Sequence, residues 1–422
     1  MAELRAMSRW SGRVLVMDAE RTGTWRADEW AGALGYDARY IASQPCGIGQ
    51  MCLELLHGLA ELVDCPRLLV LVNRQTRLPD ELWEHEKLVF CEAPGNPRGL
   101  GSQLLLPGLL KRRQVRVFHS VDCFNPVAVR GITLLVNIHD LIPLACRQQL
   151  TQSKKVRILP LWKSWLRWQC ACAAKIVTVS HHSASDLVRR LHLDPAKIEV
   201  IYNPIREWQT IEPVGDFRRQ FGLHGRIISY VGRQEPYKNV AALVRAVALV
   251  RQQMHGENLQ LVIAGNFDAR YPQTWDEVVR LRLQRHVVFT GYLAEASLGA
   301  LYQASDVFVF PSLYEGFGMP PLEAMRFGAP VVAGNRTAPP EVLGDAALLV
   351  DPADPSAIAA AVLAVLKDSE LATRLRQAGV QQVARYSRRR AAEQYLRLYQ
   401  ELLTQSTPTH RSQLKYYRAL AG

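Results

Sequence analysis

The sequence of 422 residues lacks the features that mark several common protein classes. Its eight cysteines form no C-x-x-C pair, which argues against a zinc site or a thiol redox motif. We interpret them as small buried residues of a protein from a reducing compartment. Ser8, Arg9, Ser11 and Arg13 interrupt the N-terminus, so no signal peptide is expected. No window of about 18 residues is both apolar and uncharged, so we expect no membrane-spanning helix and a cytoplasmic location.

The composition is that of an ordinary globular protein, with 48% hydrophobic and 21% charged residues. This balance argues against disorder and low complexity. The length corresponds to two domains, each large enough to bury its own core.

Positive charge is concentrated in one stretch of the chain. Residues 101–175 hold 12 Lys and Arg but only two acidic residues, Asp122 and Asp140, so the stretch carries +10 of the net charge of +12. A basic surface of this kind is compatible with nucleic acid, an anionic membrane or a phosphorylated substrate.

The first half of the chain alternates between short apolar runs and helical segments. Such runs, without clean polar alternation, are typical of strands buried on both faces of a parallel sheet. Helices are predicted between several of them, as over 51–63 and 183–191. The predicted strands are Arg13–Met17, Leu68–Val72, Leu88–Cys91, Val115–His119, Leu134–His139, Ile176–Ser180 and Ile198–Tyr202.

The same alternation restarts in the second half, after a stretch with Pro and Gly that we interpret as a linker. The predicted strands are Ile227–Val231, Leu259–Ala264, Val287–Thr290, Val307–Phe310, Pro330–Ala333 and Leu348–Asp351. The predicted helices are Val240–Met254, Ser297–Ala304, Pro321–Phe327 and Pro355–Leu366.

This pattern predicts an α/β protein with two Rossmann-like domains that face each other across a cleft, because ligands of such sheets bind at the carboxyl ends of the strands. We expect an N-terminal domain over 1–205, a linker over 206–224 and a C-terminal domain over 225–385. Residues 386–422 are predicted to form an amphipathic helix over 387–403 and a polar tail, and to return to the N-terminal domain.

The loop after the predicted strand 307–310 is the strongest candidate for a ligand site. Gly316 and Gly318 allow backbone amides to approach a ligand, and the N-terminus of the following helix favours an anion. Glu315 lies on the loop and Glu323 early in the helix, and their carboxylates suit the hydroxyl groups of a polyol. The alternative is that Glu323 only complements the helix dipole and Glu315 is solvated.

A second loop of the same kind follows the predicted strand 227–231. Arg233 can contact phosphate oxygens in a bidentate way and Lys238 adds a point charge, so the pair suits a diphosphate. Surface salt bridges are the alternative. In the first half, the Gly-rich segment 46–50 and His139 at a strand end are weaker candidates. The alternatives there are an ordinary turn and a packed histidine.

Together these motifs resemble those of the retaining glycosyltransferases of family 4, which have the two-domain GT-B fold. The resemblance is almost continuous over 228–355 and includes the Glu315 and Glu323 pair with its E-x7-E spacing. In the first half it is looser and involves Gly47-Ile48-Gly49, the segment 139–143 and the segment 179–187.

The resemblance implies a role for each residue. Arg233, Lys238, Glu315 and His139 would act in the transfer itself: the two cations hold the donor diphosphate, Glu315 contacts the sugar and His139 faces it. Glu323 would bind the ribose. The other implied contacts to the nucleotide sugar are Gly47 and Gly49 at the phosphates, Tyr292 and Leu293 along the base, and Gly316, Phe317, Gly318, Met319 and Leu322 around the two carboxylates.

No D-x-D triplet occurs in the chain, which fits transfer without a metal ion. Arg233 and Lys238 would instead stabilise the charge on the leaving diphosphate. No metal or other cofactor is expected, since the nucleotide sugar is a co-substrate. The resemblance also implies that the anomeric configuration is kept, with the leaving phosphate taking the proton of the acceptor. Glu315 and Glu323 are placed along the donor, so neither is assigned as a nucleophile.

The basic stretch suggests contact with a membrane. Trp162, Trp165 and Trp168 alternate there with Lys163 and Arg167, a mixture typical of a helix that lies in a membrane interface. The segment 104–113 is a second candidate. The alternative is a helix that packs its Trp face on the core. Peripheral contact with the anionic inner face of the plasma membrane would imply a lipid-linked acceptor, such as a polysaccharide growing on a polyprenyl diphosphate.

The segment 139–143 resembles that of family members that transfer mannose or a related deoxyhexose in O-antigen assembly. We therefore expect a GDP-sugar donor, with a UDP-sugar or dTDP-rhamnose as the alternative. A non-catalytic scaffold that binds nucleotide sugars is disfavoured because Arg233, Lys238, Glu315 and Glu323 occur together. Nucleic acid is not expected as a partner, since no basic and aromatic recognition module accompanies the charge.

Overall fold

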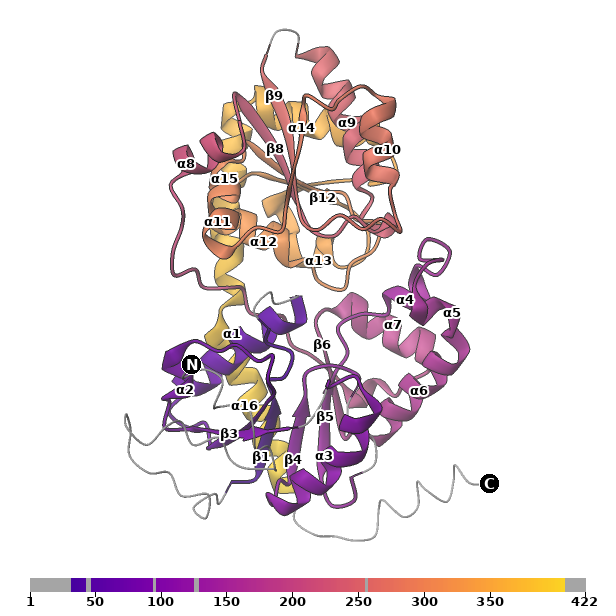
Figure 1. Ribbon diagram of the computed structural model, residues 1–422, viewed down its shortest axis with the longest axis vertical. Helices are drawn as coiled ribbons and strands as arrows, with labels where there is room; N and C mark the ends of the chain where they lie inside the picture. The colour runs from indigo at the N-terminus through magenta and orange to yellow at the C-terminus, as the bar shows by residue number, and fades with distance from the viewer. Residues whose placement is uncertain (1–31, 43–46, 94–95, 125–128, 255–256, 407–422) are drawn as a thin grey trace, which may run out of the picture.

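The structure is a computed structural model that describes residues 32–42, 47–93, 96–124, 129–254 and 257–406 (Figure 1). These residues form two α/β domains, one above the other in Figure 1, and each has its own parallel sheet. The predicted class of two Rossmann-like domains is confirmed. The strand predicted over 13–17 and most of the polar tail lie outside the described residues.

The first domain, drawn below, contains a seven-stranded sheet in the order β3-β2-β1-β4-β5-β6-β7. Strand β2 illustrates why these runs form a buried sheet. All five of its residues are buried, and alternate side chains enter different cores: Leu68 and Val70 one, Leu69 and Leu71 the other. The strands are β1 (Leu34–Asp37), β2 (Leu68–Val72), β3 (Leu88–Glu92), β4 (Val117–Ser120), β5 (Thr133–Asn137), β6 (Lys175–Thr178) and β7 (Ile198–Val200).

Helices cover both faces of this sheet. The core on one face includes residues of α1 and α16, and the core on the other includes residues of α3, α6 and α7. The helices of this domain are α1 (Gly47–Glu61), α2 (Asp80–Trp83), α3 (Leu100–Arg112), α4 (Ile142–Ala145), α5 (Lys154–Arg157), α6 (Leu159–Cys172), α7 (His181–Leu191) and α16 (Arg388–Gln405).

The second domain contains a six-stranded sheet in the order β10-β9-β8-β11-β12-β13. Its strands are β8 (Arg226–Val231), β9 (Leu259–Ala264), β10 (Val287–Gly291), β11 (Val307–Phe310), β12 (Val331–Gly334) and β13 (Ala347–Val350). Its helices are α8 (Val214–Gln220), α9 (Val240–Gln253), α10 (Gln273–Arg280), α11 (Glu295–Ala304), α12 (Met319–Arg326), α13 (Pro339–Leu343), α14 (Pro355–Lys367) and α15 (Ser369–Val383).

Differences from the prediction that bear on the site or on the domain boundary involve three elements. Helix α1 begins at Gly47 rather than near Met51, so both glycines of the predicted loop lie in its first turn. The predicted linker contains helix α8, because Pro213 precedes it and Phe217 is fully buried in the second core. Strand β1 was not predicted, since it has only four residues and includes Gly35.

The last helix returns the chain to the first domain. In Figure 1, α16 runs in yellow from the upper domain down along the lower one, where it packs against α1. A Cβ atom on Gly58 of α1 would lie 2.7 Å from the carbonyl oxygen of Arg388, so the glycine permits this close contact. Arg388 also forms ion pairs with Glu54 at 2.9 Å and Glu207 at 3.2 Å, which tie the helix to α1 and to the connection between the domains.

A buried polar network joins α16 to the first sheet. His119 of β4 contacts the hydroxyl group of Tyr399 through Nδ1 at 2.7 Å and the side-chain oxygen of Asn137 through Nε2 at 3.0 Å. The amide group of Asn137 donates in turn to the hydroxyl group of Tyr395. Burial lowers the pKa of His119 to about 4. This imidazole is therefore neutral in the folded protein near neutral pH.

This network predicts that acid weakens the first domain through His119. Its pKa falls from 6.5 in the unfolded chain to about 4 when folded, so its contribution is complete above pH 6.5 and is lost as the pH falls to about 4. The loss amounts to about 3 kcal/mol. Urea unfolding of the wild type and His119→Gln at several pH values measures it. The stability difference between the two proteins should shrink on acidification.

The comparison of the wild type with His119→Gln isolates the effect of His119. Other groups that titrate between pH 4 and pH 7 are present in both proteins, so their effects cancel in the stability difference. Burial raises the pKa of Glu54 to about 7, so this carboxyl group acts in the opposite direction and cancels between wild type and variant. A stability difference that stays constant between pH 7 and pH 4 would contradict the prediction.

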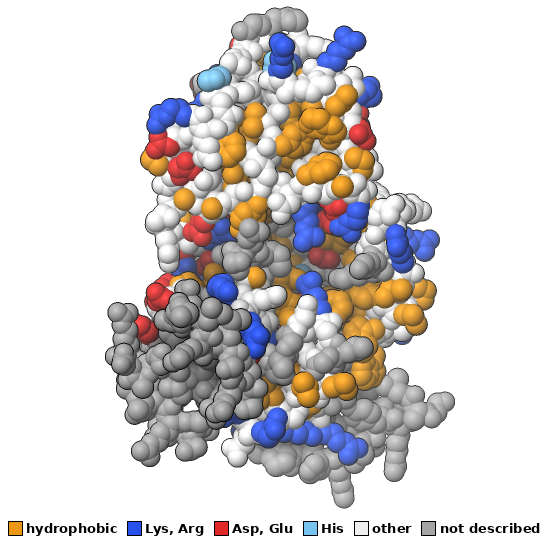
Figure 2. All heavy atoms as spheres, in the orientation of Figure 1, with side chains coloured by type: hydrophobic (Ala, Val, Ile, Leu, Met, Phe, Trp, Pro, Cys, Tyr) orange, Lys and Arg blue, Asp and Glu red, His pale blue; other side chains and the backbone are white. Residues whose placement is uncertain are grey.

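The basic helix α6 combines core and surface positions. Trp162 is buried in the core of the first domain together with Leu166, so the prediction that Trp162 faces a membrane is wrong and the core-packing alternative holds for it. Leu161 is 72% exposed and Trp168 40% exposed. Figure 2 shows hydrophobic side chains gathered over this region, at the lower right. No helix of the described residues is long and apolar enough to cross a membrane.

Candidate active site

Two loops of the second domain meet at the carboxyl ends of neighbouring strands. Strands β8 and β11 pair in parallel, so the loops that follow them emerge at the same edge of the sheet. The first loop carries Lys238 and the second carries Glu315. The ammonium nitrogen of Lys238 lies 2.7 Å from the Glu315 carboxylate, and both side chains are largely buried. The two strongest motifs of the sequence therefore form one site.

Arg233 stands at the open side of this site. Its side chain is 70% exposed, and its nearest carboxylate oxygen is that of Glu235 at 3.7 Å. Its backbone is fixed, because its carbonyl oxygen accepts a hydrogen bond from the buried Tyr230 hydroxyl group at 2.6 Å. The neighbouring loop approaches closely as well: a Cβ atom on Gly265, at φ 133°, would lie 2.1 Å from the Gly232 carbonyl oxygen. A guanidinium group on a fixed loop suits an anionic ligand.

The Glu315 loop leads directly into helix α12. The Glu315 amide donates to the Thr337 hydroxyl group at 2.9 Å, and Gly318 takes a left-handed conformation at φ 98° before the helix begins. Glu323 of α12 is buried and accepts a hydrogen bond from the Tyr302 hydroxyl group at 2.8 Å. A carboxylate has more acceptor positions than Tyr302 uses, so Glu323 can still bind ligand hydroxyl groups.

The first domain closes this site from the other side. His139 follows β5, and its Nε2 atom lies 2.9 Å from the carbonyl oxygen of Val121. Because a carbonyl oxygen only accepts hydrogen bonds, Nε2 carries the proton. The His139 backbone also touches the opposite domain. A Cβ atom on Gly316 would lie 2.6 Å from the His139 carbonyl oxygen. The structure thus brings His139 to the loop that bears Glu315.

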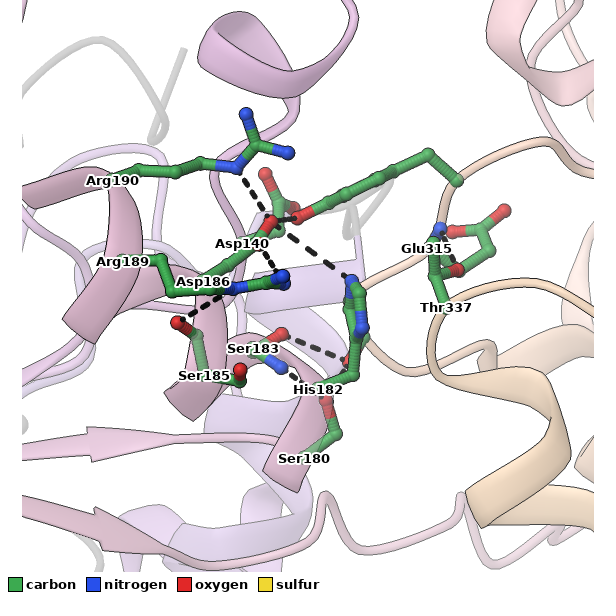
Figure 3. Close-up of polar contacts among 12 residues, drawn as sticks. Asp140, Ser180, His182, Ser183, Ser185, Asp186, Arg189, Arg190, Glu315 and Thr337 are labelled. Carbon is green, nitrogen blue, oxygen red and sulfur yellow. Dashed lines mark hydrogen bonds and ion pairs between the residues drawn. The ribbon is translucent and has the colours of Figure 1, made fainter.

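Helix α7 of the first domain makes further contacts with the same loop (Figure 3). Its N-cap residue Ser180 donates to the Gly316 carbonyl oxygen at 2.7 Å, and Tyr314 donates to Asp186 at 2.6 Å. The loop therefore lies between the two domains, and each of them fixes part of it.

Comparison with known proteins identifies the family. Residues 45–207 match the family model described as Glycosyltransferase Family 4, and residues 216–382 match that described as Glycosyl transferases group 1. The O-antigen chain mannosyltransferase B of Escherichia coli is 30% identical over 294 residues, which cover 68% of this chain and 74% of that protein. The chain belongs to glycosyltransferase family 4.

A second curated relative is longer than this family 4 glycosyltransferase. The serotype-specific mannosyltransferase WbdA of Escherichia coli is 28% identical over 285 residues. These cover 65% of this chain but only 34% of WbdA, so the chain spans about a third of that relative.

Solved structures share the fold of the glycosyltransferase. Sucrose-phosphate synthase of Thermosynechococcus elongatus superposes with a TM-score of 0.70 at 20% identity, over 88% of this chain and 99% of that chain. The HepE protein of Anabaena, solved with UDP-glucose, gives a TM-score of 0.67 at 16% identity, over 87% and 99% of the two chains. The predicted GT-B architecture is confirmed.

The other residues predicted to bind the donor differ in how far their side chains are exposed. Tyr292 is partly exposed after β10, whereas Leu293, Phe317 and Leu322 are buried in the second core, so any contact from Phe317 would come from its backbone. Met319 begins α12 at the edge of that core. Gly47 and Gly49 lie in the first turn of α1, and within the described residues a Cβ atom on Gly47 would meet no heavy atom within 4 Å.

Several polar residues of the site were not predicted from the sequence. Thr337 and Tyr302 hold the two glutamates of the enzyme, and Glu341 of α13 reaches across to α7. Thr337 and Tyr302 come from different elements, and no local pattern marks them. Gln234, next to Arg233, was not predicted either. Both polar atoms of its side chain are buried and have no hydrogen-bond partner within the described structure. Its position inside a motif was the one available signal.

Proposed function

We propose that this glycosyltransferase moves a hexose, mannose or a related deoxyhexose, from a nucleotide sugar to a glycan acceptor with retention of the anomeric configuration. The contact between Lys238 and Glu315 carries this proposal, because it unites a diphosphate-binding loop and a sugar-binding loop at one sheet edge. The two relatives named as mannosyltransferases support the choice of sugar. A GDP-sugar is the proposed donor, by analogy with the segment 139–143.

Each donor group would meet a matching protein group. Arg233 and Lys238 would hold the diphosphate, and Lys238 would then exchange part of its contact with Glu315 for a phosphate oxygen. Glu315 and the amides of 316–319 would contact the sugar, near the N-terminus of α12. Glu323 would accept hydrogen bonds from the ribose. Tyr292 and the backbone at Leu293 would lie along the base.

The transfer step would be driven by stabilising the leaving group. As the sugar acquires oxocarbenium character, negative charge develops on the departing diphosphate, and two preorganised cations stabilise it. The acceptor hydroxyl group would give its proton to the leaving phosphate on the same face of the sugar. His139, whose Nε2 proton is bound to the Val121 carbonyl oxygen, would face the transferred sugar with the rest of its ring.

A thermal-shift screen tests the donor assignment. The unfolding temperature of the protein is measured with GDP-, UDP- and dTDP-sugars at equal concentration. GDP-mannose should raise it most, because binding to the folded state alone stabilises it. A larger increase of the unfolding temperature with a UDP-sugar or dTDP-rhamnose would mean that this compound, and not GDP-mannose, is the donor. Stabilisation by a donor that the protein never hydrolyses or transfers would favour the non-catalytic scaffold.

We propose that the transfer needs no metal ion, since the cationic side chains of Arg233 and Lys238 would hold the diphosphate in its place. Activity should therefore remain within twofold of its starting value after dialysis against EDTA. The initial rate of donor hydrolysis, measured before and after chelation, checks this. Complete loss that manganese or magnesium restores would mean that the diphosphate is held by a metal instead.

We propose further that the enzyme works at the inner face of the plasma membrane, on a glycan carried by a polyprenyl diphosphate. The support is the outer side of α3 and α6, two helices that pack on the same face of the first sheet. Leu104 of α3 is 80% exposed, and Leu161 and Trp168 of α6 are also exposed. Exposed cations, among them Arg112 and Arg167, belong to the same helices. Apolar and basic groups together suit anionic lipid.

The docking proposal predicts a charge-dependent loss of membrane binding. Reversing Lys163 and Arg167 of α6, together with Arg157 of the adjoining α5, to Glu should release the protein from vesicles that contain phosphatidylglycerol, since each basic residue contributes about 1 kcal/mol. Sedimentation with these vesicles at low salt measures it, and donor hydrolysis should be unchanged. The matched control reverses three exposed cations of other helices, Lys367, Arg374 and Arg397.

The control has the same net charge as the test variant, so only the position of the charges differs. It should sediment like the wild type. Docking through α6 is refuted if the wild type stays in solution at low salt, or if both variants are released equally.

A further inference from the structure

Helix α7 makes several of the contacts between the domains. At its N-terminus, the carboxylate of Glu341 from the second domain accepts hydrogen bonds from the amides of His181 at 2.8 Å and His182 at 3.1 Å. The same carboxylate accepts from the Tyr202 hydroxyl group at 3.0 Å. A carboxylate at a helix N-terminus is favoured by the helix dipole as well.

One turn further along, Asp186 binds the loop of the active site. Its carboxylate is 1% exposed and accepts a hydrogen bond from the Tyr314 hydroxyl group across the domain boundary. Arg189 and Arg190 of the same helix bind this carboxylate at 2.9 Å each, so its charge is compensated within α7 (Figure 3). The contact with Tyr314 is therefore not needed to neutralise Asp186.

Within the Glu315 loop, the residues that α7 contacts are those on either side of Glu315. Tyr314 precedes it and binds Asp186. Gly316 follows it, and its carbonyl oxygen accepts hydrogen bonds from the hydroxyl groups of Ser180 at 2.7 Å and Ser183 at 3.2 Å. Glu315 itself is held by its own domain, through Lys238 and Thr337. The first domain thus holds Tyr314 and Gly316, and the second domain holds Glu315 between them.

Apolar packing surrounds this junction. Tyr314 is buried together with Cys146 and Leu150 of the first domain and Tyr237 of the second. Burial, followed by the hydrogen bond to Asp186, raises the pKa of Tyr314, so its phenol stays protonated and remains a donor. A buried hydrogen bond to a charged acceptor is among the stronger single contacts in a protein.

We propose that Asp186 is a positioning residue of the transferase: through Tyr314 it sets the Glu315 loop in its active geometry only when the two domains are together. This inference rests on the proposed function, in which Glu315 contacts the donor sugar. The sugar-binding loop then takes its active conformation in the same step in which the domains close. With the domains apart, Tyr314 and Gly316 lose their partners, and the loop is held only at its centre.

The test compares Tyr314→Phe with a control on the same carboxylate, Arg189→Ala. The first variant removes the bond between the domains, and the second removes an exposed partner within α7. Tyr314→Phe should lower kcat/KM for the donor about tenfold, the factor expected from one hydrogen bond to a charged group. Arg189→Ala should stay within twofold of the wild type. Small-angle scattering should give a larger radius of gyration for Tyr314→Phe alone.

Two further variants cover the case in which Tyr314→Phe folds poorly. Asp186→Asn keeps an oxygen that can accept from Tyr314, so it should retain more activity than Asp186→Ala. Equal losses in these two variants would overturn the proposal, as would wild-type activity and dimensions in Tyr314→Phe. If the wild type consumes no nucleotide sugar, the proposed function fails, while the scattering comparison still decides whether Asp186 holds the domains together.

Discussion

Arg233→Ala is expected to lose transfer activity by about 10²- to 10³-fold, the range seen when a preorganised group that stabilises developing charge is removed. Arg233 is 70% exposed, and the carboxylate nearest to it, that of Glu235 at 3.7 Å, also accepts a hydrogen bond from the Tyr237 hydroxyl group at 2.9 Å. The folded structure should therefore be unaffected. Initial rates of donor consumption and isothermal titration with a nucleoside diphosphate measure the two effects together, and nucleotide affinity should fall along with the rate.

Lys238 provides an informative comparison. Its ammonium group compensates the buried carboxylate of Glu315, so Lys238→Ala should lower both activity and thermal stability. Arg374→Ala, an exposed substitution on α15, serves as the control that changes neither. A folded Arg233→Ala protein with the nucleotide affinity of the wild type would exclude the diphosphate from this loop.

Gly316→Ala is expected to reduce transfer by about 10²-fold, because small displacements of reacting groups have effects of that size. The new Cβ atom would lie 2.6 Å from the His139 carbonyl oxygen and 2.9 Å from the Asp140 Cβ atom, both in the first domain. Either the domains separate or the Glu315 loop moves. Binding of a free nucleoside diphosphate, for which we propose Arg233 and Lys238 as the ligands, should change less than threefold. Steady-state rates and titration calorimetry separate the two effects.

Gly108→Ala is the matched control for the added methyl group. Gly108 lies in α3, and within the described residues a Cβ atom there would meet nothing within 4 Å. This variant should behave like the wild type. Full activity in Gly316→Ala would mean that the enzyme does not react with the two domains in the arrangement of Figure 1.

The strands of the second domain were largely predictable because they are short apolar runs, and β9, β11 and β12 are buried along their whole length. Strands β9 and β11 have the predicted bounds, and β8 and β10 differ from them by one residue. Helices α10 and α15 were not predicted. The polar residues of α15 hide its buried positions, such as Leu375 and Gly379, whose contacts depend on neighbours distant in sequence.

The same contrast between local patterns and contacts of residues distant in sequence applies to the site. The loops of Arg233 and Glu315 were predicted because strand, glycine and charge lie together in the sequence. The ion pair between Lys238 and Glu315 was not predicted, since it joins residues 77 positions apart. The bond between Tyr314 and Asp186 spans 128 positions and two domains. Such contacts depend on the fold, and no local pattern encodes them.

The central claim is retaining sugar transfer from a GDP-sugar. Proton NMR of the newly released sugar during donor hydrolysis tests it most directly, because water replaces the unknown acceptor. The protein is mixed with GDP-mannose, and the anomeric signal of the released sugar is recorded before the two anomers interconvert. The account predicts release of GDP together with sugar of the same anomeric configuration as the donor, and a release by Arg233→Ala that is slower by about 10²- to 10³-fold. Inverted sugar, or equal release by this variant, would contradict it.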